Sequence, residues 1–401
     1  MFGVPMAGYG LLLLLFFLFF SVSLYFGFRE WRQPSDASPL PMDVDYIRVE
    51  NYFGRSFRAK MQEWLAEAEP NGVAAGDLSD AVQRVTPGGE HLLLLPGGRI
   101  GNGRTGIGHI GNEEEELIYS EGDLTLADGA IFRREIYCQG NLETEAGVRL
   151  QSVAADGDMV LGADNDVARW VDAQGGIVIR GGTVVGSRAS SLVLIELERG
   201  VSVQSLYAPI ISTARFGSTA QIGAHPDSGD SPDGEDFPFL SAIQSGAKKQ
   251  SGNGGSSGDK KAKPQFLEGV RCAQLDSGTW LVQDDLSLPA GTRIEDNLVV
   301  KGVLTSGPGC IFLKDVKAAR LELGERSHAL GNLAAEDQLR VGEGSFVARN
   351  IAAGSNVRLA AGARVGRPES LAVVSAGGEI ILEQDVTVCG KVIASRWVRT
   401  V

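Results

Sequence analysis

The sequence is poor in proline, aromatic residues, histidine and cysteine. Its 401 residues include only 15 Pro against 53 Gly, and 7% are aromatic. This composition disfavours both a collagen and a Pro-rich disordered chain. The four cysteines, Cys138, Cys272, Cys310 and Cys389, lie far apart and form no CxxC pair. We therefore expect neither a zinc site nor a dense disulfide framework, and a reduced, cytoplasmic environment fits best.

Positive charge is also scarce. The chain has 37 Lys and Arg against 50 Asp and Glu, which gives a formal net charge of −13. An acidic surface repels a phosphate backbone, so no nucleic-acid partner is expected. Hydrophobic residues nevertheless make up 43% of the chain. That share is enough for a substantial folded core.

Motifs for nucleotide, metal and hydrolytic chemistry are missing or incomplete. The chain has no Lys-containing P-loop, no GxSxG and no HExxH. Residues 101–106 satisfy GxGxxG, but further glycines follow where a dinucleotide site needs the start of a helix. The run Glu113–Glu116 has no Asn, Gly or Asp ligands at loop spacing, so we interpret it as a solvated face. We expect no bound cofactor, no metal site and no enzymatic activity.

One uncharged run stands near the N-terminus. Residues 9–28 contain no charge, and a helix of that length matches a hydrocarbon core about 30 Å thick. A cleaved signal peptide is the alternative, although residues 1–8 lack the usual Lys or Arg. The first positive charges, Arg29 and Arg32, directly follow the uncharged run. The positive-inside rule therefore predicts a single-pass inner-membrane protein whose body faces the cytoplasm. The expected anchor and lipid contacts are Tyr9, Leu11, Phe16, Phe20, Tyr25, Arg29, Trp31 and Arg32.

Residues 31–116 form a non-repetitive connecting region after the anchor, which we place at 1–30. Within it Phe57, Met61, Trp64, Leu65 and Ala68 recur at helical spacing, which predicts an amphipathic helix near 56–69. We expect this helix to pack on the neighbouring domain. A helix lying on a membrane surface is the alternative.

Residues 117–223 contain many short apolar dyads, that is, two apolar residues separated by one position, with Gly, Asp and Asn between the dyads. Gly-x-apolar turns begin at Gly122, Gly140, Gly157 and Gly175, so they recur at intervals of about 18 residues. A second block, 268–401, keeps the same period. Its dyads Leu321/Leu323, Leu339/Val341 and Val357/Leu359 follow one another at this interval.

A period of 17–18 residues that divides into three units of about six describes a triangular β-helix, or solenoid, with short parallel strands stacked about 4.8 Å apart. The sequence therefore predicts an all-β solenoid in two blocks. Residues 224–267 separate the blocks and are low-complexity, so they form either a linker or a loop from one continuous solenoid.

The repeated units resemble those of the bactofilins, the polymer-forming cytoskeletal proteins of bacteria. The resemblance rests on Gly122–Gly129 (GDLTLADG), Gly157–Gly162 (GDMVLG) and Leu339–Gly344 (LRVGEG). It implies a right-handed β-helix, assembly without nucleotide, and a role in cell shape or in positioning envelope-synthesis proteins. Bactofilins are usually short, with one β-helix between disordered tails. The present chain is long and has two blocks.

An uncapped solenoid end exposes unpaired N–H and C=O groups and invites another copy to stack on it. The C-terminal rungs run almost to the chain end, so we expect the contact between copies there, at Ile380, Leu382, Val386, Val388, Val392 and Ile393.

The predicted function is thus a self-assembling membrane-anchored scaffold. One alternative is a β-helical enzyme like the hexapeptide acyltransferases, with His328 as general base. The other is an exported solenoid that binds envelope glycan or protein.

Overall fold

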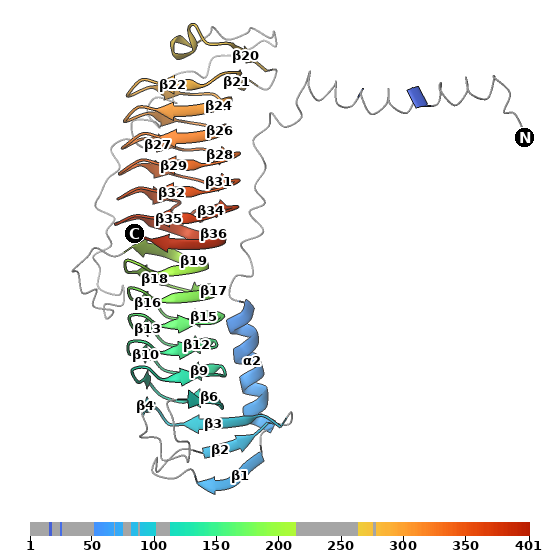
Figure 1. Ribbon diagram of the computed structural model, residues 1–401, viewed down its shortest axis with the longest axis vertical. Coiled ribbons are helices and arrows are strands. Elements are labelled where there is room, and N and C mark those ends of the chain that lie inside the picture. The colour runs from blue at the N-terminus through green and yellow to red at the C-terminus, as the bar shows by residue number, and fades with distance from the viewer. Residues whose placement is uncertain are drawn as a thin grey trace, which may run out of the picture.

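The computed structural model describes residues 52–67, 69–74, 82–86, 89–101, 113–213, 264–275 and 278–401, together with Phe16, Phe17 and Tyr25. Within these residues the fold consists of helix α2 (Tyr52–Glu67), a short 3-10 helix η4 (Gln265–Leu267) and a long column of stacked strands. Figure 1 shows the column, with α2 lying along its lower half. The fold is a β-solenoid.

The first solenoid has three faces, and each turn of the chain contributes one strand to each face. Face A contains β3 (His91–Leu95), β6 (Leu117–Ser120), β9 (Ile136–Cys138), β12 (Val153–Ala155), β15 (Trp170–Ala173) and the end of β17 (Val184–Ser191). Face B contains β4 (Gly98–Ile100), β7 (Leu124–Leu126), β10 (Leu142–Thr144), β13 (Met159–Leu161), β16 (Ile177–Ile179) and β18 (Leu194–Leu197). Face C contains β5 (Glu113–Glu114), β8 (Ile131–Phe132), β11 (Arg149–Leu150), β14 (Asp166–Val167) and the start of β17. Strand β19 (Ser202–Thr213) crosses all three faces as the last rung.

The second solenoid repeats this plan. Its face A contains β21 (Trp280–Val282), the start of β24 (Leu298–Ser306), the start of β26 (Val316–Leu323), β28 (Leu333–Ala335), β31 (Ile351–Ala353) and β34 (Ala372–Ala376). Face B contains β22 (Leu286–Leu288), the ends of β24 and β26, β29 (Leu339–Val341), β32 (Val357–Leu359) and β35 (Ile380–Leu382). Face C contains β23 (Arg293–Ile294), β25 (Ile311–Phe312), β27 (His328–Ala329), β30 (Phe346–Val347) and β33 (Arg364–Val365). Strand β36 (Thr387–Thr400) is its last rung.

Alternation within each short strand builds the core. In β29, for example, Leu339 and Val341 are buried while Arg340 between them is exposed. A single rung cannot bury its own apolar side chains, so each rung is stabilised by the rungs stacked on it. The inward residues of both solenoids form one continuous hydrophobic cluster.

The Gly-Asp and Gly-Asn turns of the first solenoid form a hydrogen-bonded ladder between faces A and B. The Oδ1 atom of Asp123 accepts the Asn141 N–H at 2.7 Å, and Oδ1 of Asn141 accepts the Asp158 N–H at 2.8 Å. Glycine precedes each of these residues because the corner is crowded. A Cβ on Gly157 would overlap Oδ1 of Asn141. The repeated Gly-Asp or Gly-Asn motif therefore marks the corner between faces A and B in successive rungs.

The two solenoids meet end to end in the middle of the column, where β19 pairs with β36. Both run toward this meeting point, so the C-terminus lies at mid-column and β1 and β20 lie at opposite ends (Figure 1). The blocks thus form one continuous column.

Several boundaries differ from those expected. The first solenoid begins at β3 rather than at residue 117, because β3 already pairs in parallel with β6. The helix expected near 56–69 is α2, which spans Tyr52–Glu67. Most of the expected linker, residues 224–263, lies outside the described residues, and 265–267 form η4.

The prediction of a transmembrane helix is corrected by the structure. Among the described residues no helix is long and apolar enough to cross a membrane. Crossing takes about 20 apolar helical residues, whereas α2 has 16 and includes charged side chains. Of the expected anchor the structure describes Phe16, Phe17 and Tyr25. The other anchor residues, Tyr9, Leu11, Phe20, Arg29, Trp31 and Arg32, lie outside the described residues. Single-pass inner-membrane anchoring is therefore not retained.

Candidate functional site: the seam between the two solenoids

The last rung of each solenoid covers the last rung of the other. Strands β19 and β36 run antiparallel, with Val203 opposite Val398, Leu206 opposite Val392 and Ile211 opposite Val388. All six side chains are almost completely buried. We call this β19–β36 contact the seam. It covers the last rung of each solenoid, whose apolar side chains would be exposed if that solenoid were isolated.

The seam has an approximate two-fold axis. Within their own solenoids, Val203 and Val388 occupy the same face C position, and Ile211 and Val398 the same face B position. Across the seam the face C residue of each solenoid lies opposite the face B residue of the other. Exchanging the two solenoids therefore leaves this set of contacts unchanged. A contact with this property is isologous, as in a symmetric dimer.

Two threonines repeat the symmetry in hydrogen bonds. The hydroxyl of Thr213 donates to the Glu383 carbonyl at 2.7 Å and accepts the Val386 N–H at 2.8 Å. The hydroxyl of Thr400 makes the equivalent bonds to Glu198 and Val201, at 2.6 and 3.0 Å. Both threonines are 5% exposed. Each threonine therefore provides hydrogen-bond partners for one C=O and one N–H group at the end of the opposite solenoid, where no further rung of that solenoid could pair with them.

The residues predicted to join separate copies lie at this seam. Val388, Val392 and Ile393 are paired with β19, and Val386 gives its N–H to Thr213. Ile380 and Leu382 lie one rung back, beneath Val398 and Thr400. In the structure the partner at this end is β19 of the same chain.

The outer ends of the column are closed by antiparallel strands. At one end β1 (Glu69–Ala74), β2 (Val82–Val85) and β3 form an antiparallel meander. At the other end β20 (Cys272–Gln274) pairs with β21, and Leu267 of η4 is fully buried against the core. Among the described strands, β1 pairs only with β2 and β20 only with β21. Each outer strand thus keeps one edge without a strand partner in the described part of the chain.

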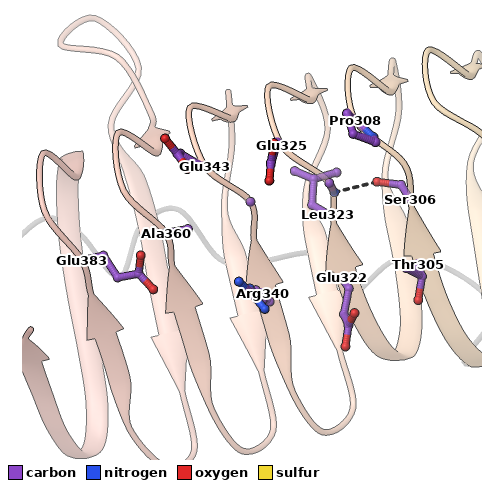
Figure 2. Close-up of a pocket in the computed structure, with 12 residues that line it drawn as sticks. Thr305, Ser306, Pro308, Glu322, Leu323, Glu325, Arg340, Glu343, Ala360 and Glu383 are labelled. Carbon is purple, nitrogen blue, oxygen red and sulfur yellow. Dashed lines mark hydrogen bonds between the residues drawn. The ribbon is translucent and has the colours of Figure 1, made fainter.

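An open hollow of about 340 Å³ lies along the corner between faces B and C of the second solenoid. Figure 2 shows that carboxylates from successive rungs and the Arg340 side chain surround it. Gly324 and Gly342 line it, and a Cβ on either would overlap the backbone of the preceding rung. The Gly324 N–H donates to the Ser306 hydroxyl oxygen at 2.9 Å. Glu383 pairs with Arg358 at 2.6 Å. No histidine or cysteine is among the residues that line the hollow.

The other candidate residues lie apart from the hollow. His328 is half-buried on β27, its ring 6.4 Å from that of Phe346, and burial lowers the pKa of its imidazole. Glu113 and Glu114 pair with β8 in the sheet. Among the described residues no group of three or more His, Cys, Asp or Glu could hold a metal ion. Of residues 101–106 only Gly101 is described.

Sequence reasoning missed two features. Thr213 and Thr400 have no local signal, since only the long-range pairing of β19 with β36 gives them a role. The second feature is Arg58 with Asp156 and Asp172, which form a buried ion-pair cluster under α2. Tyr119 and Tyr137, at outward positions one rung apart, mark that covered face and could have indicated it.

No family model, no curated protein and no solved structure matches the chain, so the resemblance to bactofilins stays a prediction.

Proposed function

We propose that this protein is a structural scaffold: a rigid rod made of two solenoids, which assembles with other copies through its outer ends and needs no nucleotide. The seam is the observation that carries this proposal. It turns two repeat domains into one column whose strands, core and hydrogen bonds continue without interruption.

The dimensions suit a spacer or a support. Face A contains fourteen described strands, seven from each solenoid. At about 4.8 Å per strand the column is roughly 60 Å long. Stacked rungs contact only their neighbours, and each is fixed by three strand ladders. Such a rod holds whatever binds at its two ends or along its faces at a set separation, as a scaffold for other proteins requires.

The open edge of β20 is the best-defined place for contact with another copy. Two hydrogen bonds, Leu275 N–H to Thr279 C=O and Gln283 N–H to Arg271 C=O, turn the odd-numbered residues of this strand toward β21. In an antiparallel pair the intervening residues turn their N–H and C=O groups the other way. Cys272 and Gln274 therefore direct backbone groups to the open edge. A strand from a second copy can pair with an edge of this kind.

Negative-stain electron microscopy of the purified protein, without nucleotide or metal, tests the proposal. We expect rods that join end to end. The variant Gln274→Pro removes one outward N–H while sparing the hydrogen bonds between β20 and β21, and should leave single rods. Gln274→Ala keeps the N–H and is the matched control, with normal assembly.

Two results would overturn the proposal in separate parts. Rods that stay single at every protein concentration would refute self-assembly. Particles with two lobes that move relative to each other would remove the continuous rod on which the scaffold function rests.

A further inference from the structure

One outward strip of the first solenoid is unusually apolar and is covered by α2. Ladder partners on the outside of face A include Tyr119, Tyr137, Ala154 and Asp172. Outward positions of a solenoid normally meet water, yet Tyr137 is 1% exposed and Ala154 is fully buried. The strip is therefore built for a covering element.

The inner side of α2 fits the strip closely. Met61 is fully buried, and Phe57, Trp64 and Leu65 pack with it against the strip. The Phe57 ring meets the Trp170 ring edge to face, with centroids 5.5 Å apart. Aromatic contacts of this geometry stabilise the packing beyond the area they bury.

A socket for a guanidinium group lies at the end of the strip. Arg58 Nε donates to Oδ1 of Asp156 at 2.7 Å, and Nη1 donates to Oδ1 of Asp172. The remaining nitrogen, Nη2, donates to the Ala155 carbonyl at 2.6 Å. Two carboxylates and a carbonyl thus use the planar fork of an arginine, which the single ammonium of a lysine could not replace.

The solenoid holds this socket in shape without help from α2. The Tyr137 hydroxyl donates to Oδ2 of Asp156 at 2.6 Å, and Nε2 of Gln174 donates to its Oδ1 at 2.8 Å. The Ser190 hydroxyl donates to Oδ2 of Asp172 at 2.5 Å. Burial also raises the pKa of Asp172, and a cation opposes that effect. The solenoid's own hydrogen bonds thus orient both carboxylates.

The helix, by contrast, depends on the solenoid. It has 16 residues and no acidic residue in its first turn to favour the helix dipole. In proteins most of the stability of a helix comes from packing of its apolar face rather than from helix propensity. Gly54, near its start, lies so close to Asp172 that an added Cβ would overlap the carboxyl group. The helix is thus a segment shaped for this surface, and it gains its structure by docking.

We propose that this strip and its socket form a binding site for an arginine-bearing amphipathic helix, which α2 occupies in its own chain and which the α2 of a second copy occupies when the first is detached. The occupant follows from the fit described above. A tethered α2 faces the strip at an effective concentration of about millimolar, so the exchange requires weakening of the helix in its own chain. Exchange would bind copies side by side, a contact independent of the outer ends.

The test uses the full chain with its own helix weakened by Phe57→Ala, Arg58→Ala and Met61→Ala. The probe is a fluorescent peptide of residues 52–67, followed by anisotropy. We expect the peptide to bind this variant at least tenfold more tightly than the unaltered chain. The chain variant Arg55→Ala changes an exposed residue of α2 and should behave like the unaltered chain.

Two controls locate the site. A peptide with Arg58→Lys should bind at least tenfold more weakly, because it cannot bridge both carboxylates. Adding Asp172→Asn to the weakened chain should cause a similar loss. Circular dichroism reports whether the solenoid stays folded.

The proposal is overturned if the weakened chain keeps its β-sheet spectrum and binds no peptide. It is equally overturned if binding ignores Asp172→Asn. Loss of the sheet spectrum in the weakened chain would overturn it too, since the socket would then not exist without its own helix.

Discussion

The symmetry of the seam makes a quantitative prediction for two residues that lie far apart in the sequence, Thr213 and Thr400. Each hydroxyl bridges a carbonyl and an N–H of the opposite solenoid in the same geometry. Replacing either by Val keeps the shape and removes both bonds. A buried N–H left without a partner costs about 1–3 kcal/mol. We expect Thr213→Val and Thr400→Val to destabilise the seam by equal amounts within about 0.5 kcal/mol.

The first solenoid contains a matched control. The Thr183 hydroxyl donates to the Gly162 carbonyl at 2.7 Å and accepts the Asn165 N–H at 3.2 Å, which is the same motif between two rungs of one solenoid. Thr183→Val therefore removes equivalent bonds without touching the seam. It should weaken the first solenoid itself, whereas the two seam variants weaken only the coupling between solenoids.

Urea unfolding, followed by tryptophan fluorescence and circular dichroism, distinguishes these effects. The double seam variant should lose about 2–6 kcal/mol of coupling, because distant sites add, and its unfolding should separate into two transitions. Thr183→Val should shift the unfolding of the first solenoid alone. If one seam variant costs nothing while the other has the full cost of an unpaired buried N–H, the two-fold reasoning is refuted.

Two further predictions concern groups buried away from the seam. Gly54→Ala should detach the first turn of α2 despite the higher helix propensity of Ala, at a net cost of about 1–3 kcal/mol, because the new methyl group overlaps Asp172. Limited proteolysis within α2 checks this against Ser56→Ala, an exposed control, and equal cleavage of both would contradict it. Burial raises the pKa of the Cys138 thiol to about 11, so at pH 8 roughly one molecule in a thousand carries the reactive thiolate. Thiol labelling of the native protein should modify the half-buried Cys272 first, with the Cys138 rate rising about tenfold per pH unit until its pKa, and rapid Cys138 labelling at pH 8 would show that the core is open there.

The sequence predicted the rungs well because their signal is local. Leu339 and Val341 form β29, and Val357 and Leu359 form β32 in the next rung, in the register that the repeat interval requires. Alternation within a strand and crowding at the corners act over a few residues, so they leave a pattern that can be read. The period fails where residues are inserted. Arg367–Ser370 form a small bridge between faces C and A, and the step from Ala353 to its partner Ala376 is longer than the regular period.

The seam could not be predicted in the same way. Val388 and Val392 alternate like the residues of any inner rung, and nothing in their neighbourhood distinguishes an end that meets a second copy from one that meets β19. The difference lies in a pairing between segments from the two halves of the chain. The arginine socket was missed for the same reason, since Arg58 meets Asp156 and Asp172 only through the stacking of rungs.

The direction of the two solenoids decides what kind of assembly remains open to the chain. Both solenoids run toward the seam, so both outer ends are beginnings of a solenoid and the two last rungs are consumed inside the molecule. A rod with two equivalent tips would join others without polarity. The tips here differ, however, because one is a three-stranded meander and the other a short hairpin with η4. A contact of hairpin with hairpin is isologous and stops at a pair of rods, whereas a contact of hairpin with meander repeats without limit.

Electron microscopy of Gln274→Pro separates these cases. Under the first, the unaltered protein forms pairs that the variant lacks. Under the second, it forms long filaments, and the variant reduces them to single rods. If the variant assembles as the unaltered protein does, the contact lies elsewhere and the edge of β20 has no part in it.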